Sequence, residues 1–166
     1  MLGGVNQSKS VLFVCLGNIC RSPMAEGAFR AAALRRGLEC HVDSAGTASY
    51  HLGHAPDPRA IATAARHGID IASQTARQIA HADFYRFTHI VALDRANLEG
   101  VRARAPRDGT AQLALLMDAV DGRQGQPVAD PYHGDIAAFE AAWQIINLGA
   151  HAWVERLISE NADLSV

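Results

Sequence analysis

The chain has 166 residues, of which 49% are hydrophobic and 19% are charged, and its formal net charge is −2. This length predicts one domain with a core that needs neither disulfides nor a structural metal. The near balance of charge argues against a nucleic-acid or membrane-surface partner, and no apolar run approaches the ~20 residues of a membrane helix. We expect residues 1–8 to be a flexible extension without a secretory signal and residues 9–162 to be the domain. The three cysteines suit a reducing cytoplasm.

The first predicted element is a strand at residues 11–14, an unbroken run of large apolar side chains. Such a run is typical of a strand buried on both faces of a parallel sheet. Cys15 stands at its carboxyl end, and a loop at residues 16–21 follows. Gly17 and Asn18 adopt left-handed backbone conformations most readily, so we expect the loop to curl there.

A helix is predicted directly after this loop. Ser22 is a suitable N-cap, and Pro23 suits the first helical position. Apolar residues recur at helical spacing through residues 24–36, and Gly37 is a suitable C-cap. The N–H groups of the curled loop and the helix N-terminus would face one concavity, which is typical of an anion-binding site.

Cys15 and Arg21 give this predicted anion site its chemistry. The loop N–H groups, the helix dipole and the Arg21 cation all favour the thiolate form of a cysteine. The planar guanidinium of Arg21 can hold two oxygens of a tetrahedral oxyanion. The pattern therefore predicts a thiolate placed beneath a bound phosphate, ready to attack phosphorus.

Strands and helices alternate along the rest of the chain. Strands are predicted at residues 40–43, 88–93 and 112–116, and helices at 57–68, at 96–102 and from 135 onward, the last with one apolar face running from Ile136 to Leu157. Residues 118–133, rich in Gly, Pro and Asp, are predicted to form a long surface loop. This order predicts an α/β fold, a single-domain three-layer sandwich with a four-stranded parallel sheet and helices on both faces. Ligands of such sheets bind beyond the carboxyl ends of the strands, where Cys15 lies.

The nine residues from Cys15 to Pro23, Cys-Leu-Gly-Asn-Ile-Cys-Arg-Ser-Pro, resemble the Cys-x5-Arg-Ser phosphate loop of the low-molecular-weight protein tyrosine phosphatases. Further segments resemble landmarks of that family in family order: Asp43-Ser44-Ala45-Gly46-Thr47, Pro56-Asp57-Pro58-Arg59-Ala60, His67-Gly68-Ile69, Ala76-Arg77-Gln78 and Asp130-Pro131-Tyr132. The resemblance implies a protein-tyrosine-phosphatase that hydrolyses phosphotyrosine monoesters through a Cys15 thiophosphate intermediate. It implies no cofactor. We expect no metal site, because His51 and His54, the closest histidine pair, have no Cys or carboxylate at ligand spacing.

Asp130 is the candidate for the general acid that a phosphate ester needs to lose its alcohol. The resemblance implies that Asp130 protonates the leaving phenolate and later activates the water that hydrolyses the phosphocysteine. Taken alone, Asp130-Pro131 is also ordinary turn chemistry.

Supporting roles follow from the same resemblance. Phosphate binding and loop support are expected from Leu16, Gly17, Asn18, Ile19, Cys20, Ser22 and Ser44. Among these, Asn18 is expected to bond to Ser44, and Ser22 to donate to the Cys15 thiolate. Cys20 is the expected redox partner of Cys15 in a reversible disulfide.

Three further residues have positions near the predicted site. Tyr50 and Tyr132 are the expected walls of a deep apolar slot for a phosphotyrosine ring, and an exposed loop tyrosine without a task is the alternative for Tyr50. Asp94 follows the strand at residues 88–93. It could orient Arg21, and helix N-capping is the reading that we favour.

Three other functions remain as alternatives. An arsenate reductase on this fold needs further redox cysteines downstream, and this chain has none after Cys40. A protein-arginine phosphatase of related sequence carries Thr where Ile19 stands. A catalytically silent phosphopeptide-binding module would need neither a thiolate nor an acid.

The expected partner is a phosphotyrosine-containing protein. All basic residues except Lys9 are arginines, which suggests a GC-rich bacterial genome. For a bacterial source, the resemblance suggests an autophosphorylating tyrosine kinase as the substrate.

Overall fold

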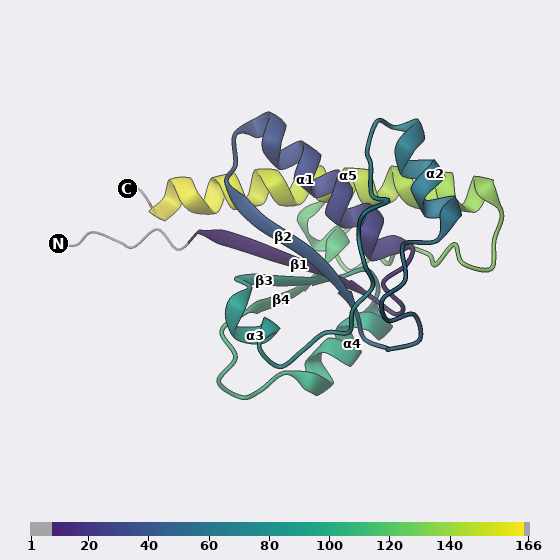
Figure 1. Cartoon of the computed structure of the whole chain (residues 1–166). Helices are drawn as coiled ribbons and strands as arrows, with labels where there is room; N and C mark the ends of the chain where they lie inside the picture. The colour runs from purple at the N-terminus through teal and green to yellow at the C-terminus, as the bar shows by residue number, and fades with distance from the viewer. Residues whose placement is uncertain (1–7, 165–166) are drawn as a thin grey trace.

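The apolar runs pair as a four-stranded sheet of order β2-β1-β3-β4 in a computed structural model that describes residues 8–164 (Figure 1). The strands are β1 (Lys9–Cys15), β2 (Cys40–Gly46), β3 (His89–Ala92) and β4 (Gln112–Leu115). The helices are α1 (Arg21–Arg36), α2 (Pro58–Arg66), α3 (Asp83–Arg86), α4 (Arg95–Arg104) and α5 (Ile136–Leu164), with a 3-10 helix, η1 (Leu116–Ala119). The predicted α/β class is confirmed. The extension expected at residues 1–8 lies, except for Ser8, outside the described residues.

All three strand pairings are parallel, so the carboxyl ends of the strands meet at one edge of the sheet. In the registers, Cys15 lies opposite Gly46 of β2, and Val14 lies opposite Ala92 of β3. The side chains of Val11, Leu12, Phe13 and Val14 are fully buried. The central strand β1 therefore carries Cys15 to the ligand-binding edge from the middle of the core.

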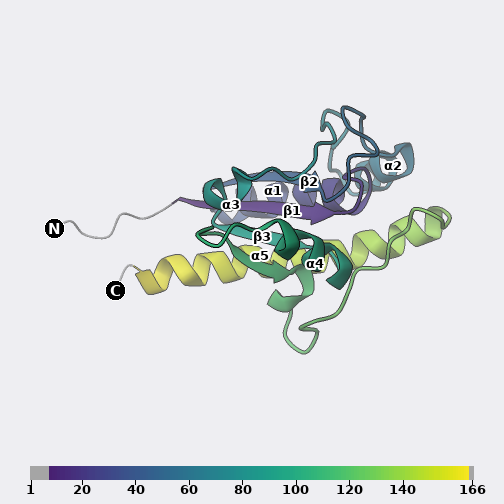
Figure 2. The same ribbon diagram turned by 90° about the horizontal axis from the view of Figure 1, so that it is seen from below.

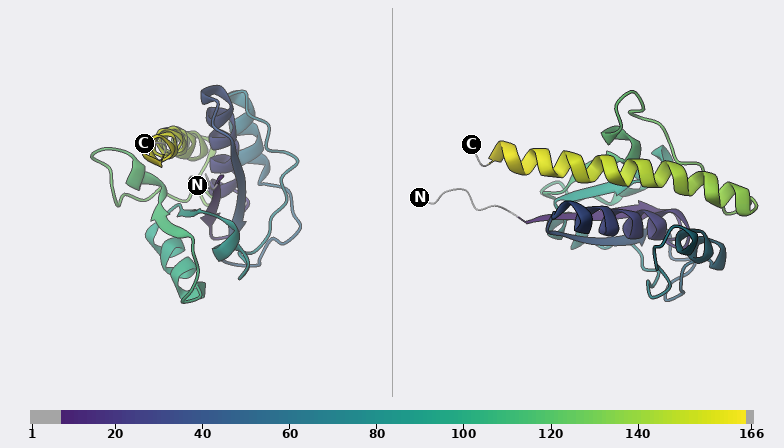
Figure 3. Two further views of the ribbon diagram at one scale, coloured as in Figure 1. Left: turned by 90° about the vertical axis from the view of Figure 1, so that its left-hand side faces the viewer. Right: turned by 90° about the horizontal axis from the view of Figure 1, so that it is seen from above.

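Helices cover both faces of the sheet, as the views from other sides show (Figures 2 and 3). On one face α1 packs against the long helix α5, with α2 beside them, around Phe13, Phe29 and Trp153. On the other face α3 and α4 cover Leu12, Ile90 and other residues of a second cluster. Each large apolar side chain buried in this way contributes about 1.5–3 kcal/mol.

The long terminal helix begins one residue later than residue 135, and Ile136 does not belong to its buried face. Ile136 is 62% exposed because it is the first residue of α5, whereas Phe139 is the first large side chain of the helix in the core. Farther along, the indole N–H of Trp153 donates to the carbonyl of Leu116 at 2.8 Å. This bond fixes α5 to η1, next to the end of β4.

The start of α1 differs from the prediction in two respects. The helix begins at Arg21 with Cys20 at the N-cap position, so the prediction that Ser22 caps it is wrong. The hydroxyl of Ser22 instead contacts Cys15 and Asn18 in the loop after β1. Among the described non-glycine residues, Asn18 alone has a positive φ, 57°, and Gly17 does not share it. A Cβ at Gly17 would lie 3.0 Å from Cδ2 of His51, so a larger residue there would require the His51 ring to shift by a few tenths of an ångström. At the other end of α1, Gly37 is the predicted left-handed C-cap.

Candidate active site

A pocket of about 370 Å³ opens beyond the carboxyl end of β1. Three segments of the chain line it: the loop after β1, the connection from β2 to α2, and the loop before α5. The lining residues are Cys15, Leu16, Gly17, Ile19, Cys20, Arg21, Tyr50, His51, Asp130, Tyr132 and His133. The structure thus brings the predicted nucleophile, cation, acid and aromatic walls to one cavity.

Cys15 lies at the floor of this pocket. Its side chain is 3% exposed, and its Sγ lies 3.0 Å from the hydroxyl oxygen of Ser22. The backbone around it is fixed, because its carbonyl accepts from the N–H of Thr47 at 2.9 Å and the carbonyl of Leu16 accepts from Ala48 at 2.9 Å. The sulfur is therefore held in one place by the sheet and by the first turn of α1.

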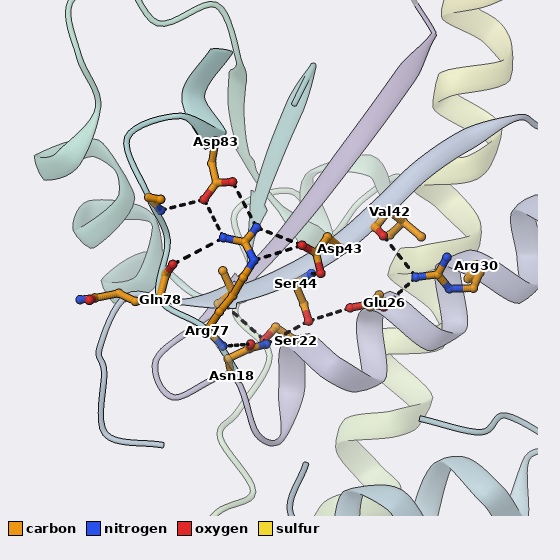
Figure 4. A network of polar contacts seen from close by, with 12 residues as sticks. Asn18, Ser22, Glu26, Arg30, Val42, Asp43, Ser44, Arg77, Gln78 and Asp83 are labelled. Atoms are coloured by element: carbon orange, nitrogen blue, oxygen red, sulfur yellow. Dashed lines mark hydrogen bonds and ion pairs between the residues drawn. The ribbon is translucent and has the colours of Figure 1, made fainter. Parts of the chain in front are cut away.

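Asn18 holds the curled loop together (Figure 4). Its amide nitrogen donates to Ser22 Oγ at 2.8 Å and to Ser44 Oγ at 2.9 Å, so the expected bond to Ser44 is present. Its amide oxygen accepts from the backbone N–H of Arg77 at 3.0 Å. The left-handed backbone turns this side chain inward, and one residue links the loop to α1, β2 and the segment before α3.

Two charged groups stand behind this network (Figure 4). Ser44 donates to the carboxylate of Glu26 at 2.8 Å, and burial raises the pKa of Glu26 although Arg30 and Ser44 oppose the shift. The guanidinium of Arg77 lies between Asp43 and Asp83, with donor–acceptor distances of 3.1 and 2.9 Å. The contacts with Glu26, Asp43 and Asp83 therefore hold Ser44 and Arg77, the partners of Asn18, in place.

Arg21 is 3% exposed, and half of its guanidinium is already engaged. Its Nη1 donates to Oδ2 of Asp94 at 2.7 Å and to the carbonyl of Val128 at 2.8 Å. Asp94 also caps α4, because its Oδ1 accepts from the N–H of Asn97 at 2.7 Å, so both roles considered for Asp94 are present. Within the described residues, Nε and Nη2 of Arg21 donate to no protein acceptor. That edge of the guanidinium can donate to two oxygens of an anion.

Asp130 faces Arg21 from the loop before α5. One of its carboxylate oxygens lies 3.7 Å from Nη2 of Arg21, and the side chain is 44% exposed. The other oxygen accepts from the backbone N–H of Tyr132 at 3.1 Å, which fixes the turn that Asp-Pro chemistry predicts. A carboxyl group at the pocket mouth can exchange protons with a ligand and with solvent.

Cys20 shares the pocket with Cys15, and both are free thiols. Burial raises the pKa of Cys20, and the negative charges of Asp57 and Cys15 raise it further. Cys20 therefore stays a neutral thiol at neutral pH, beside the residue predicted to be the nucleophile.

Two residues at this site were not predicted from the sequence. His51 forms part of the pocket wall, with its ring centroid 6.5 Å from that of Tyr132. Arg59 joins the phosphate loop to the loop of Asp130, as described below. The segment around Arg59 predicted the start of a helix and resembles a family landmark, but nothing in its spacing pointed to contacts with a loop more than 70 residues away.

Comparison with known proteins identifies the family of this chain. The family model described as low molecular weight phosphotyrosine protein phosphatase matches residues 10–163. The chain belongs to this family.

Its relatives resemble it over most of their length. The low molecular weight phosphotyrosine protein phosphatase 2 of Drosophila melanogaster is 39% identical over 159 residues, covering 93% of this chain and 96% of the relative. The crystal structure of YfkJ from Bacillus subtilis superposes with a TM-score of 0.86 at 36% identity, covering 95% of this chain and 99% of that one. The structure of a Drosophila arginine phosphatase gives a TM-score of 0.82 at 32% identity, with coverages of 89% and 96%. Within residues 8–164, no helix combines the length and the apolar character needed to cross a membrane.

Proposed function

We propose that this phosphatase hydrolyses phosphotyrosine in proteins, with Cys15 as the nucleophile, Arg21 as the phosphate-binding cation and Asp130 as the general acid and base. The observation that carries the proposal is the convergence of these three side chains on one pocket, Cys15 and Arg21 from the loop after β1 and Asp130 from the distant loop before α5. Such a set fits covalent catalysis, because a binding module needs neither a thiolate nor an acid.

In the first step, the thiolate of Cys15 attacks phosphorus and the bond from phosphorus to the phenolic oxygen breaks. Asp130 gives its proton to the leaving phenolate, and the Nε and Nη2 groups of Arg21 hold two phosphoryl oxygens. In the second step, the oxygen of a water molecule attacks the phosphorus of the phosphocysteine, and Asp130 takes a proton from that water. The sulfur–phosphorus bond breaks, inorganic phosphate is formed, and the Ser22 hydroxyl donates to the departing thiolate.

The pocket walls favour an aryl phosphate. Leu16, Ile19, Tyr50 and Tyr132 surround the path from the surface to the buried sulfur of Cys15. A phosphotyrosine ring can fill this path and reach the floor, whereas the shorter side chain of phosphoserine cannot. We infer that the substrate is a phosphotyrosine-containing protein, and for a bacterial host an autophosphorylating tyrosine kinase, in a reducing compartment such as the cytoplasm.

The test is hydrolysis of one peptide sequence carrying phosphotyrosine, phosphoserine or phosphoarginine. The reduced protein should release phosphate from the phosphotyrosyl peptide alone. Cys15→Ser should abolish turnover, and Asp130→Asn should lower kcat/KM by about 100-fold or more, the size of a general-acid contribution. Phosphate binding without turnover would overturn the enzymatic proposal. Turnover of phosphoarginine alone would favour the second candidate, suggested by the Drosophila arginine phosphatase neighbour.

A further inference from the structure

Arg59, in the first turn of α2, forms a rigid unit with Asp57. Its Nε and Nη2 donate to the two carboxylate oxygens of Asp57 at 3.0 and 2.9 Å. This pairing lowers the pKa of Asp57, chiefly through the side-chain hydrogen bonds from Arg59. The backbone N–H of Asp57 in turn donates to the carbonyl of Ile19 at 2.8 Å. The pair is therefore attached to the phosphate loop.

The same guanidinium also holds the loop that carries Asp130. Its Nη2 donates to the carbonyl of Tyr132 at 3.0 Å, and its Nη1 donates to the carbonyl of Gly134 at 3.1 Å. The guanidinium carbon lies 4.5 Å from the ring centroid of Phe139, which is fully buried in α5. One planar cation thus joins the phosphate loop, the acid loop and the start of α5.

Helix capping does not account for this arrangement. Asp57 caps α2 by accepting from the backbone N–H of Arg59, and any residue other than proline at position 59 would supply that N–H. An ordinary surface ion pair also differs, as Arg36 shows, because within residues 8–164 that arginine bonds only Glu155. The Arg59 contacts use three different nitrogens of the guanidinium. A lysine could not reproduce them, because its three donors sit on a single nitrogen.

We propose that Arg59 is a positioning residue that holds Asp130 where it can protonate the leaving group. The inference rests on the role proposed above for Asp130. Without the guanidinium, the carbonyls of Tyr132 and Gly134 lose their donor and the acid loop is free to move away from the phosphate loop. Misplacing a general acid slows reactions in proportion to how much the leaving group needs a proton.

Two aryl phosphates separate this role from a structural one. Phenyl phosphate has a basic leaving group that needs a proton, and 2,4-dinitrophenyl phosphate has an acidic one that does not. In Arg59→Ala and Arg59→Lys, the ratio of kcat/KM for dinitrophenyl phosphate to that for phenyl phosphate should rise by about tenfold or more. Loss of pocket-wall packing affects both substrates alike and cancels in this ratio. The decline of kcat/KM on the basic side of its pH optimum should also flatten.

The controls identify which proposal fails. Arg36→Ala, at an exposed arginine outside the pocket, should leave the ratio unchanged. Asp130→Asn should raise the ratio; if it does not, the proposed role of Asp130 is wrong. If Asp130→Asn raises the ratio and neither Arg59 variant does, the positioning role of Arg59 is wrong. Arg59→Lys keeps the charge and the aliphatic stem. If Arg59→Ala does not fold, the kcat/KM ratio of Arg59→Lys alone decides the test.

Discussion

Nη1 of Arg21 lies 2.7 Å from Oδ2 of Asp94, at the point where the carboxylate also caps α4. The orientation of Arg21, the proposed phosphate-binding cation, is therefore set by the protein itself, before any ligand binds. The carbonyl of Val128 accepts from the same nitrogen, so rotation of the guanidinium would break two bonds. Such preorganised groups bind a developing charge without reorganising during the reaction.

Replacing Asp94 tests this orientation. Asp94→Asn keeps a good helix N-cap and removes the charge that holds Arg21. Because hydrogen bonds to charged groups contribute about 1.5–3 kcal/mol, we expect kcat/KM for a phosphotyrosyl peptide to fall by about 10- to 100-fold. The melting temperature should change little in Asp94→Asn and fall in Asp94→Ala, which also loses the cap. Unchanged kcat/KM in both variants would contradict the orienting role.

Ser22→Ala should slow the second chemical step. The hydroxyl lies 3.0 Å from Cys15 Sγ, where it can donate to the sulfur as the phosphocysteine is hydrolysed. With p-nitrophenyl phosphate, we expect a rapid burst of one nitrophenolate per active site and a steady-state kcat lower by about 10-fold or more. Ser10→Ala, at the opposite end of β1, is the matched control and should behave like the parent. A variant without a burst and with normal kcat would exclude this role.

Oxidation should be reversible only while Cys20 is present. Hydrogen peroxide converts a cysteine thiolate to a sulfenic acid with release of hydroxide, and a nearby thiol condenses with the sulfenic acid to a disulfide with loss of water. Cys20 is a buried thiol in the same pocket as Cys15. After peroxide treatment, dithiothreitol should restore most activity of the parent and little activity of Cys20→Ser. Cys40→Ser is the control, and equal recovery in all three proteins would contradict the expectation.

The stability of the fold should depend on the protonation of His89. This histidine of β3 is 2% exposed, and burial lowers its pKa below the usual 6.5 despite Glu160 nearby. Because the folded protein favours the neutral ring, the contribution to stability is present above pH 6.5 and is lost as the pH falls through the lower pKa of the folded state.

Urea unfolding of the parent and of His89→Gln measures this contribution. The free energy of unfolding of the parent relative to the variant should decrease between about pH 7.5 and about pH 5. A constant difference across this pH range would show that the pKa of His89 is the same in both states.

Local patterns predicted the four strands and the helices α1, α2, α4 and α5, with bounds that differ from the observed ones by up to three residues, and they did not predict α3. The apolar run of β1, the cap pair Asp57-Pro58 and the C-cap Gly37 each depend on neighbours in sequence, and each is present. The prediction that Ser22 caps α1 was wrong, and the reason is physical. Ser22 satisfies the rules for an N-cap, but its hydroxyl is taken by Asn18 and Cys15, which belong to a fold-dependent loop. Tertiary contacts here replaced a local preference.

Which residues come together at the site depends on how the chain connects its strands and helices. Parallel strands predicted that Cys15 lies at the ligand-binding edge, and the family resemblance supplied Asp130. Neither source indicated Arg59 or His51, because each acts through segments that only the folded chain brings together. The sequence suggested two alternative roles for Asp94, orienting Arg21 and capping a helix. The structure shows that the one carboxylate accepts hydrogen bonds in both roles.

The indole of Trp153, bonded to Leu116, has a spectroscopic consequence. Trp153 and Trp143, the two tryptophans of the chain, are both buried on α5, and neither lines the pocket. Their fluorescence will therefore report the packing of the terminal helix and remain nearly silent when a phosphate ester binds. Tyr50 and Tyr132, in the pocket wall, are the chromophores that a bound aromatic ring will quench. Excitation at the tryptophan band thus gives each active-site variant an optical check of its fold that is independent of its catalytic state.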